Sequence, residues 1–179
     1  MAATRLGLYN DALLLVGERA LASLTESREP RRLLDQVWNN NGVEECLESG
    51  QWNFAMKTIR IDYDPGIEPD FGYSRAFDKP DDWILTSALC SDEFFRSPLT
   101  QYVDERGFWF ASIDTIYVRY VSNAADYGGD LATWPRSFAE FAAAHFASKI
   151  VLKMTNDGKR LEVILKLREK LKREAKSRA

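Results

Sequence analysis

Side chains suited to catalysis or metal binding are few in this sequence. The single histidine, His145, stands among alanines and phenylalanines at helical spacing, which favours a packed side chain over a general base. The closest acidic pairs, Asp62 with Asp64 and Asp81 with Asp82, lie beside prolines in turn-like segments, where aspartate usually bonds the local backbone. The sequence has no glycine-rich phosphate loop, no G-x-S-x-G elbow and no H-E-x-x-H motif. We therefore expect no enzyme activity, no metal site and no cofactor.

The strongest charge asymmetry lies near the C-terminus. Residues 159–178 contain nine Lys/Arg and three Glu residues, a net charge of +6, whereas the whole chain carries −3. A basic segment on an acidic chain suggests contact with an acidic protein surface, with nucleic acid or with another copy of the chain. The alternative is a solvated helix end whose cations suit the helix dipole. The candidate contact residues are Lys166, Arg168, Lys170, Lys172, Arg173, Lys176 and Arg178.

Composition limits the class of protein further. A chain of 179 residues with 45% apolar residues is typical of one folded globular domain. No apolar run approaches the roughly 20 residues that span a bilayer, so we expect no membrane partner. Asn10 and Asp11 interrupt the apolar N-terminal segment, which favours an amphipathic helix over a signal peptide. The two cysteines, Cys46 and Cys90, predict a reducing compartment without disulfides.

Hydrophobic periodicity predicts the elements that position these side chains. A helical period favours helices over about 4–16, 27–50, 134–155 and 159–176, with Ser27 as an N-cap, Pro30 in a first turn and a weak interval at 39–42. Alternation predicts strands at 58–63, 83–85, 101–104, 108–111 and 114–121, with Gly107 in a hairpin turn. The Pro-, Gly- and Asp-rich residues 64–82 are expected to form a long loop.

This pattern predicts a mainly α fold with inserted β structure, namely a bundle of about four helices interrupted by a small antiparallel sheet. Residues 1–56 are expected to form the N-terminal helices, 57–122 an inserted antiparallel β subdomain with long loops, and 130–179 the C-terminal helices that complete the bundle. Aromatic residues near the junctions are expected to anchor the two parts together. These structural anchors are Trp38, Trp52, Phe54, Trp134 and Phe138.

An ordered set of short motifs along most of the chain resembles a known family. The motifs are ALLLVGE (12–18) with SL (23–24), RLLDQVW (32–38) leading to WNFA (52–55), FGY (71–73) with FDKPDDW (77–83), YVRY (117–120) and WPRSF (134–138). Together with the order of helices and strands, they resemble the head-to-tail adaptor proteins of tailed bacteriophages, which are also called connector or tail tubular protein A-like proteins.

The resemblance implies a structural virion protein at the head–tail junction, assembled in the bacterial cytoplasm. In that family the protein forms a homo-oligomeric ring, usually of about twelve copies. One side docks on the portal protein and the other receives the tail or stopper protein, while DNA passes through the channel without sequence-specific binding. The helices would then form the body of each copy, the sheet and its loops would face the tail side, and the basic C-terminal helix would contact the portal.

The sequence is also compatible with two other classes of protein. A nucleic-acid-binding module could use the basic C-terminal helix, and its affinity would fall steeply with salt. The acidic balance of the chain and the lack of aromatic residues among those cations weigh against it. A small cytoplasmic α+β protein of another kind is the second alternative; an enzyme of this class would need a pocket with convergent polar groups, for which the sequence offers no motif.

Overall fold

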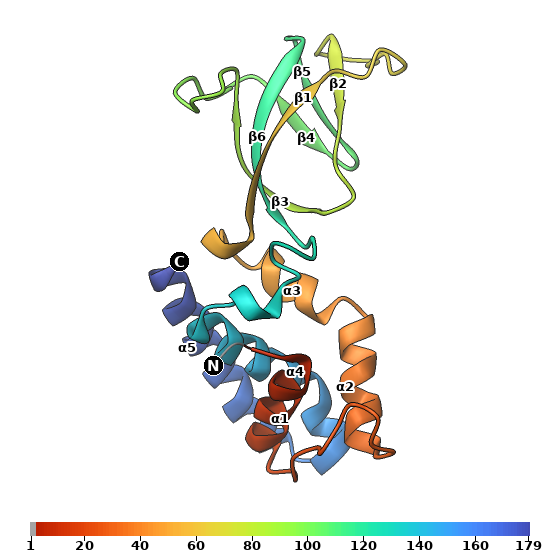
Figure 1. The fold of residues 1–179 in the computed structure, drawn as a ribbon, viewed down its shortest axis with the longest axis vertical. Helices are drawn as coiled ribbons and strands as arrows, with labels where there is room; N and C mark the ends of the chain where they lie inside the picture. The colour runs from red at the N-terminus through yellow and green to blue at the C-terminus, as the bar shows by residue number, and fades with distance from the viewer. Residues whose placement is uncertain (1–2) are drawn as a thin grey trace.

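The computed structural model describes residues 3–179, which form a helical lobe and a β lobe joined by a neck (Figure 1). The neck comprises residues 52–56 and 121–134, including the short 3₁₀ helices η1 (Asn53–Ala55) and η2 (Leu131–Thr133). The helical lobe contains α1 (Arg5–Val16), α2 (Glu29–Asn39), α3 (Gly42–Glu48), α4 (Arg136–Thr155) and α5 (Gly158–Arg178). The β lobe contains β1 (Met56–Asp62), β2 (Arg75–Asp78), β3 (Trp83–Cys90), β4 (Val103–Glu105), β5 (Phe108–Ala111) and β6 (Thr115–Ser122).

Local sequence signals account for the ends of several helices. The Thr4 hydroxyl accepts a hydrogen bond from the Gly7 backbone N–H at 3.0 Å and caps α1. Gly17 ends this helix with a left-handed backbone (φ 85°) that glycine adopts without strain. The Asp157 carboxylate caps the last helix by accepting from the backbone N–H groups of Lys159 and Arg160. The predicted first and last helices are thereby confirmed.

The single helix expected over 27–50 is wrong, because the chain breaks into α2 and α3. Asn41 takes a left-handed backbone (φ 62°), which no helix interior permits. Gly42 follows at a point where a Cβ atom would come within 2.7 Å of the Val37 carbonyl oxygen. Ser27 is not the cap either: the N-cap residue is Arg28, which makes no side-chain capping bond.

The β lobe consists of two three-stranded antiparallel sheets, with strand orders β1-β6-β3 and β2-β5-β4. Their inner faces enclose a small core in which Phe77, Trp109 and Ile116 are fully buried. The predicted alternation of the last strand is confirmed, since Ile116, Val118 and Tyr120 all have no exposed surface. The predicted hairpin at Gly107 is also confirmed, with φ 86° in its turn between β4 and β5.

The expected fold class, a helical bundle of about four helices interrupted by a small sheet, is wrong. Residues 3–179 contain five helices and six strands in two sheets, with 44% helix and 20% strand, so the fold is mixed α+β. The main cause is β2, a four-residue strand inside the segment that its prolines, glycines and aspartates marked as loop. Because β2 pairs with β5 and β5 with β4, the insert gains a second sheet and closes a core of its own.

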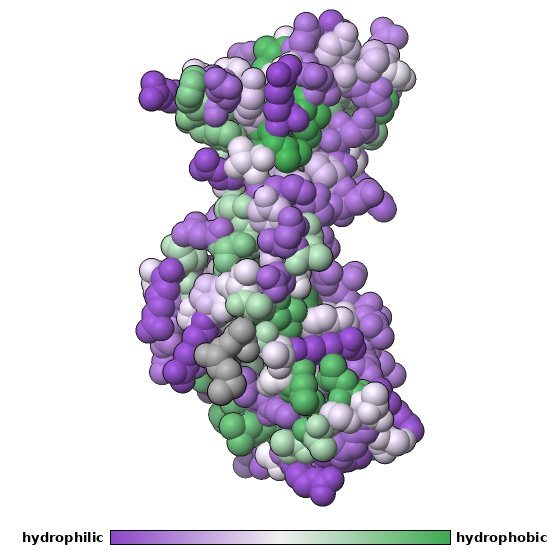
Figure 2. All heavy atoms as spheres, in the orientation of Figure 1, coloured by the Kyte–Doolittle hydropathy of each residue, from purple (hydrophilic) through white to green (hydrophobic). Residues whose placement is uncertain are grey.

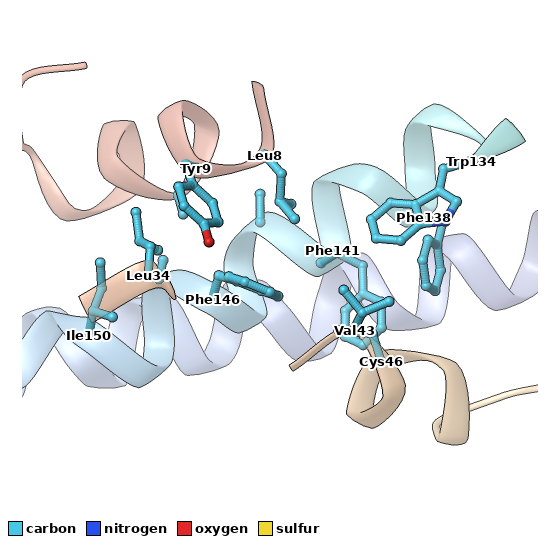
Figure 3. Packing of buried hydrophobic residues seen from close by; sticks show 14 of the residues in the cluster. Leu8, Tyr9, Leu34, Val43, Cys46, Trp134, Phe138, Phe141, Phe146 and Ile150 are labelled. Atoms are coloured by element: carbon cyan, nitrogen blue, oxygen red, sulfur yellow. The ribbon is translucent and has the colours of Figure 1, made fainter. Parts of the chain in front are cut away.

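In the helical lobe α4 lies at the centre and contacts all four other helices. Its buried alanines, Ala142, Ala143, Ala144 and Ala147, allow those neighbours to approach closely. Figure 3 shows the bulkier side chains around it, with Phe146 of α4 packed beside Tyr9 of α1. This arrangement leaves the outer face of α5 open to solvent.

Candidate functional site

The exposed face of α5 carries a line of cations. Lys159, Lys166, Lys170 and Arg173 are all exposed and recur at helical spacing, with Val163 (66% exposed) among them. On the opposite face Ile164 and Ala175 are each only 2% exposed and belong to the helical core. We refer to Lys159, Lys166, Lys170 and Arg173 as the cationic stripe; of these, only Lys170 approaches an acid within residues 3–179, at 3.9 Å from Glu174.

The other predicted contact cations have different surroundings. Arg168 and Lys172 both pair with Glu169, at 3.0 and 2.9 Å, so their charges are partly compensated within α5. Lys176 and Arg178 lie at the exposed end of the helix, beside the neck (Figure 1), where the Lys176 side chain runs along Gly50. The structure thus separates the predicted set into a stripe, a paired group and a helix end.

Arg160 shows that one basic residue of this segment has a role in the fold. Its Nη1 donates a hydrogen bond of 2.7 Å to the Val16 carbonyl oxygen. This bond satisfies one of the carbonyl groups left free at the C-terminal end of α1, where a cation also suits the helix dipole.

Four of the five predicted anchors meet at the neck. The ring of Phe138 lies 4.8 Å, between centroids, from each of Trp52, Phe54 and Trp134. Trp134 Nε1 also donates to the Gly128 carbonyl oxygen at 2.9 Å. The cluster joins the start of α4 to the segment that leads into β1, and so fixes one lobe to the other.

Trp38, the fifth predicted anchor, lies away from the neck. Its ring packs in the helical lobe against Tyr9 and Phe146, and the Arg5 guanidinium sits 4.6 Å from its centroid. It therefore stabilises the packing of α2 on α1 and α4.

Asp82 forms a polar cluster at the base of the β lobe that sequence reasoning missed. Its carboxylate accepts from Lys57 Nζ at 2.8 Å, Ser122 Oγ at 2.6 Å and Tyr120 Oη at 3.0 Å. Burial opposes its ionisation, but these donors prevail and lower the pKa of Asp82 below its ordinary value. The same burial, together with the bond to Asp82, raises the pKa of Tyr120 to about 12.

The prediction that these turn aspartates bond the local backbone is correct only in part. The Asp64 carboxylate accepts from the Gly66 backbone N–H at 2.7 Å, as expected. Asp82 instead joins β1 to β6, and its partners lie 25 to 40 residues away in sequence. No local pattern signals contacts at such separation.

A second polar cluster lies between the two sheets. Lys79, whose side chain is 5% exposed, pairs with Asp104, and its Nζ stands 3.7 Å from the centroid of the Trp83 ring. Thr86 Oγ1 donates to Asp104 at 2.6 Å and accepts from the indole N–H of Trp109 at 3.0 Å. These contacts tie β3 of one sheet to β4 and β5 of the other.

His145 is a packed side chain, as the sequence predicted. It is 7% exposed, and its Nε2 lies 2.8 Å from Glu45, which also binds Lys149 at 2.7 Å. Burial lowers the pKa of His145, although the Glu45 carboxylate opposes the shift. The arrangement fastens α3 to α4.

The described residues form neither a metal site nor a membrane-spanning helix. In the part of the chain that the structure describes, no three His, Cys, Asp or Glu side chains gather in a way that could hold a metal ion. Within the same residues, no helix combines the length and apolar character that crossing a membrane requires.

The loops of the β lobe present large aromatic side chains to solvent. Phe71 is 90% exposed and Phe94 is 69% exposed. Phe71 and Phe108 border a shallow groove of ≈ 270 Å³ that also contains Glu68 and Glu105. Residues 57–122 carry seven Lys/Arg and twelve Asp/Glu residues, a net charge of −5, so this surface is acidic and aromatic. Exposed aromatic side chains of this kind are typical of protein contacts.

The fold and these surfaces define a two-lobed α+β protein whose candidate sites are docking surfaces. Neither the family models nor the curated proteins that were searched contain a match to this chain. We therefore infer the function from the geometry of the two lobes and from the motifs in the sequence.

Proposed function

We propose that the protein is a head-to-tail adaptor of a tailed bacteriophage, a structural virion protein that forms a ring between portal and tail. The observation that carries this proposal is the two-ended shape (Figure 1), in which each lobe offers a different docking surface. The helical lobe exposes the cations of α5, whereas the β lobe has a net charge of −5 and exposed aromatic loops. An adaptor needs two such ends, because it binds two different partners.

In this proposal the portal protein contacts the helical lobe along α5, including the last turn of this helix beside the neck. Lys176 and Arg178 are exposed, and their long, flexible side chains can pair with acidic residues of a partner. Phe71, Phe94 and their loops face the tail or stopper protein. About twelve copies form the ring, and each contact can be weak because ring closure multiplies it.

The neck supports this division of roles. The Phe138 cluster and the Asp82 cluster both lie where the two lobes join, one on each side of the neck. Two clusters at one junction resist bending, so a copy docked through one lobe would hold the other lobe at a set angle. Such rigidity suits a ring that must align a tail with a capsid vertex.

Hydrogen exchange with the cognate portal protein tests the proposal. We expect the portal to slow exchange in the helical lobe, including the end of α5, and to leave residues 64–74 and 91–99 unchanged. Protection confined to the β lobe would contradict the proposed orientation. No protection at any concentration of portal would contradict the proposed role.

Charge variants test the α5 contact without removing packed residues. Truncation of α5 is unsuitable, because Ala175 is buried and Leu171 packs against the core. We expect Lys176→Gln with Arg178→Gln to weaken portal binding roughly tenfold at low salt. The matched control removes the same charge from the β lobe, by Arg96→Gln with Arg106→Gln, and should leave portal binding unchanged.

The cationic stripe also favours a second candidate function, non-specific nucleic-acid binding. Four exposed cations on one face of a helix suit contacts with successive phosphates. In that case affinity for duplex DNA would fall steeply with salt and would vanish in Lys166→Glu with Lys170→Glu. DNA binding that stays weak and depends little on the stripe would leave the adaptor as the better account.

A further inference from the structure

A groove of ≈ 700 Å³ opens on the helical lobe between α1, α4 and α5. Leu14 and Leu15 of α1 line it together with Ala139 of α4 and Leu171 of α5. Leu14 is 76% exposed, and Figure 2 shows apolar side chains gathered on this lobe near α1. The small side chain of Ala139 leaves room for another helix to approach. An exposed apolar groove of this size favours a protein ligand.

The rim of the groove carries a net negative charge, because two acids, Asp11 and Glu140, line it with one cation, Arg136. Arg136, whose side chain is 93% exposed, pairs with Glu140 at 2.8 Å, which leaves Asp11, within the described part of the chain, as the acid without a cationic partner. Among residues 3–179, no side chain forms an ion pair or a hydrogen bond with the Asp11 carboxylate. Partial burial and the charge of Glu140 raise the pKa of Asp11. A ligand that brings cations to the rim would relieve this repulsion.

The cationic stripe has the complementary chemistry. It combines Lys166, Lys170 and Arg173 with the apolar Val163, all on one helical face. Lys170 precedes Leu171, which lines the groove, and successive residues of a helix point about 100° apart. The stripe of a copy therefore points away from the groove of that same copy, and only a second copy can bring the two together.

We propose that the groove between α1, α4 and α5 of one copy receives the cationic stripe of the next copy. Val163 and neighbouring side-chain stems would cover Leu14, and Lys166 or Lys170 would reach Asp11 and Glu140. Because groove and stripe are different surfaces, this contact is heterologous and repeats from copy to copy into a ring or filament. The inference rests on the proposed function, for which it names the interface between copies.

Cross-linking tests the contact directly. Leu14→Cys with Val163→Cys places one thiol on each surface, while the native Cys46 and Cys90 are buried. With a short thiol-specific cross-linker at the highest soluble concentration, we expect a ladder of dimers, trimers and larger species. Neither single variant should form the ladder. Dimers alone, from the single as well as the double variant, would show a two-fold contact and overturn the inference.

Charge exchange supplies a second, independent readout. Asp11→Lys, and separately Lys166→Glu with Lys170→Glu, should each weaken self-association roughly tenfold or more in sedimentation velocity. An equal mixture of the two variants should recover association, because each groove then meets a stripe of opposite charge. The control Lys153→Glu, on the exposed surface of α4 outside the groove, should change nothing.

The outcomes separate this inference from the proposed function. Rings on a portal without a cross-linked ladder, or with no rescue in the mixture, would overturn the interface and leave the adaptor role standing. A wild-type protein that stays monomeric at every concentration would also overturn the interface, because no second copy would bind. A ladder without portal binding would support the interface and count against the adaptor role.

Discussion

The two lobes are stabilised in different ways. The helical lobe packs large apolar side chains such as Trp52, Phe138 and Phe146 around α4. The β lobe has a smaller apolar core and adds a polar cluster in which Lys79 and Asp104 join its two sheets. A small unit buries a smaller share of its surface, so apolar packing alone stabilises it less. The β lobe therefore depends more on buried polar contacts between its sheets, and the helical lobe depends more on apolar packing.

Loss of packing at the neck should have the largest effect. We expect Phe138→Ala to lower the free energy of unfolding by about 3–5 kcal/mol, because it opens a cavity among three aromatic rings. Urea denaturation followed by circular dichroism measures this loss. The exposed Phe94→Ala is the control and should change stability by less than about 0.5 kcal/mol. Equal effects of the two variants would contradict the account of the neck.

Removal of the buried cation Lys79 should destabilise the β lobe and leave the helical lobe unaffected. Lys79→Met leaves the Asp104 carboxylate without its ion-pair partner, so we expect a loss of about 3 kcal/mol. Hydrogen exchange should rise in β4 and β5 and stay unchanged in α1 and α4. The double variant Lys79→Met with Asp104→Leu should lose less stability than the two single variants added together. If the losses in unfolding free energy were additive, the two side chains would act independently, which would contradict their pairing.

The Asp82 cluster should matter less, and its effect should depend on pH. Asp82→Asn removes a charged acceptor from Lys57, Tyr120 and Ser122, and we expect a loss of about 2 kcal/mol at neutral pH. Because the pKa of Asp82 is lowered in the folded state, its contribution is present above the ordinary aspartate pKa and disappears as pH falls through the lowered value. The difference in unfolding free energy between wild type and variant should therefore shrink in acid. A difference that grows in acid would contradict an ionised Asp82 in the cluster.

The smallest expected effect belongs to His145 in the helical lobe. Its folded-state pKa is lowered, so the unfolded state binds a proton first and stability falls as pH drops below about 6.5. His145→Gln retains a hydrogen-bond donor for Glu45 but cannot titrate. The change in unfolding free energy with pH should therefore be smaller in this variant, by roughly 1 kcal/mol or less. Urea denaturation at pH 7.5 and 5.5 measures the difference. An unchanged pH dependence would show that the ring is not held neutral.

Sequence patterns predicted those parts of the fold that depend on local chemistry. Thr4, Gly17 and Asp157 mark helix ends through hydrogen bonds that span a few residues. The alternation from Ile116 to Tyr120 predicted which side chains are buried, because strand geometry imposes a period of two.

The remainder depends on contacts between distant residues. The sequence of β2 resembles a loop, and the strand forms through its pairing with the neighbouring strand β5, where Phe77 lies opposite Trp109. Asp82 reaches Ser122 forty residues later. The groove beside Leu14 unites three helices, so only their packing reveals it. The basic character of α5 was predictable, but its division into a stripe, a paired group and a helix end was not.

We propose that copies of this chain assemble into a ring on a portal. Native mass measurement with negative-stain imaging of the protein mixed with its cognate portal protein tests this most directly. We expect a ring of about twelve copies seated on the portal, with the β lobes projecting away from it. A protein that stays monomeric and unbound in the presence of the portal, at every concentration, would contradict it.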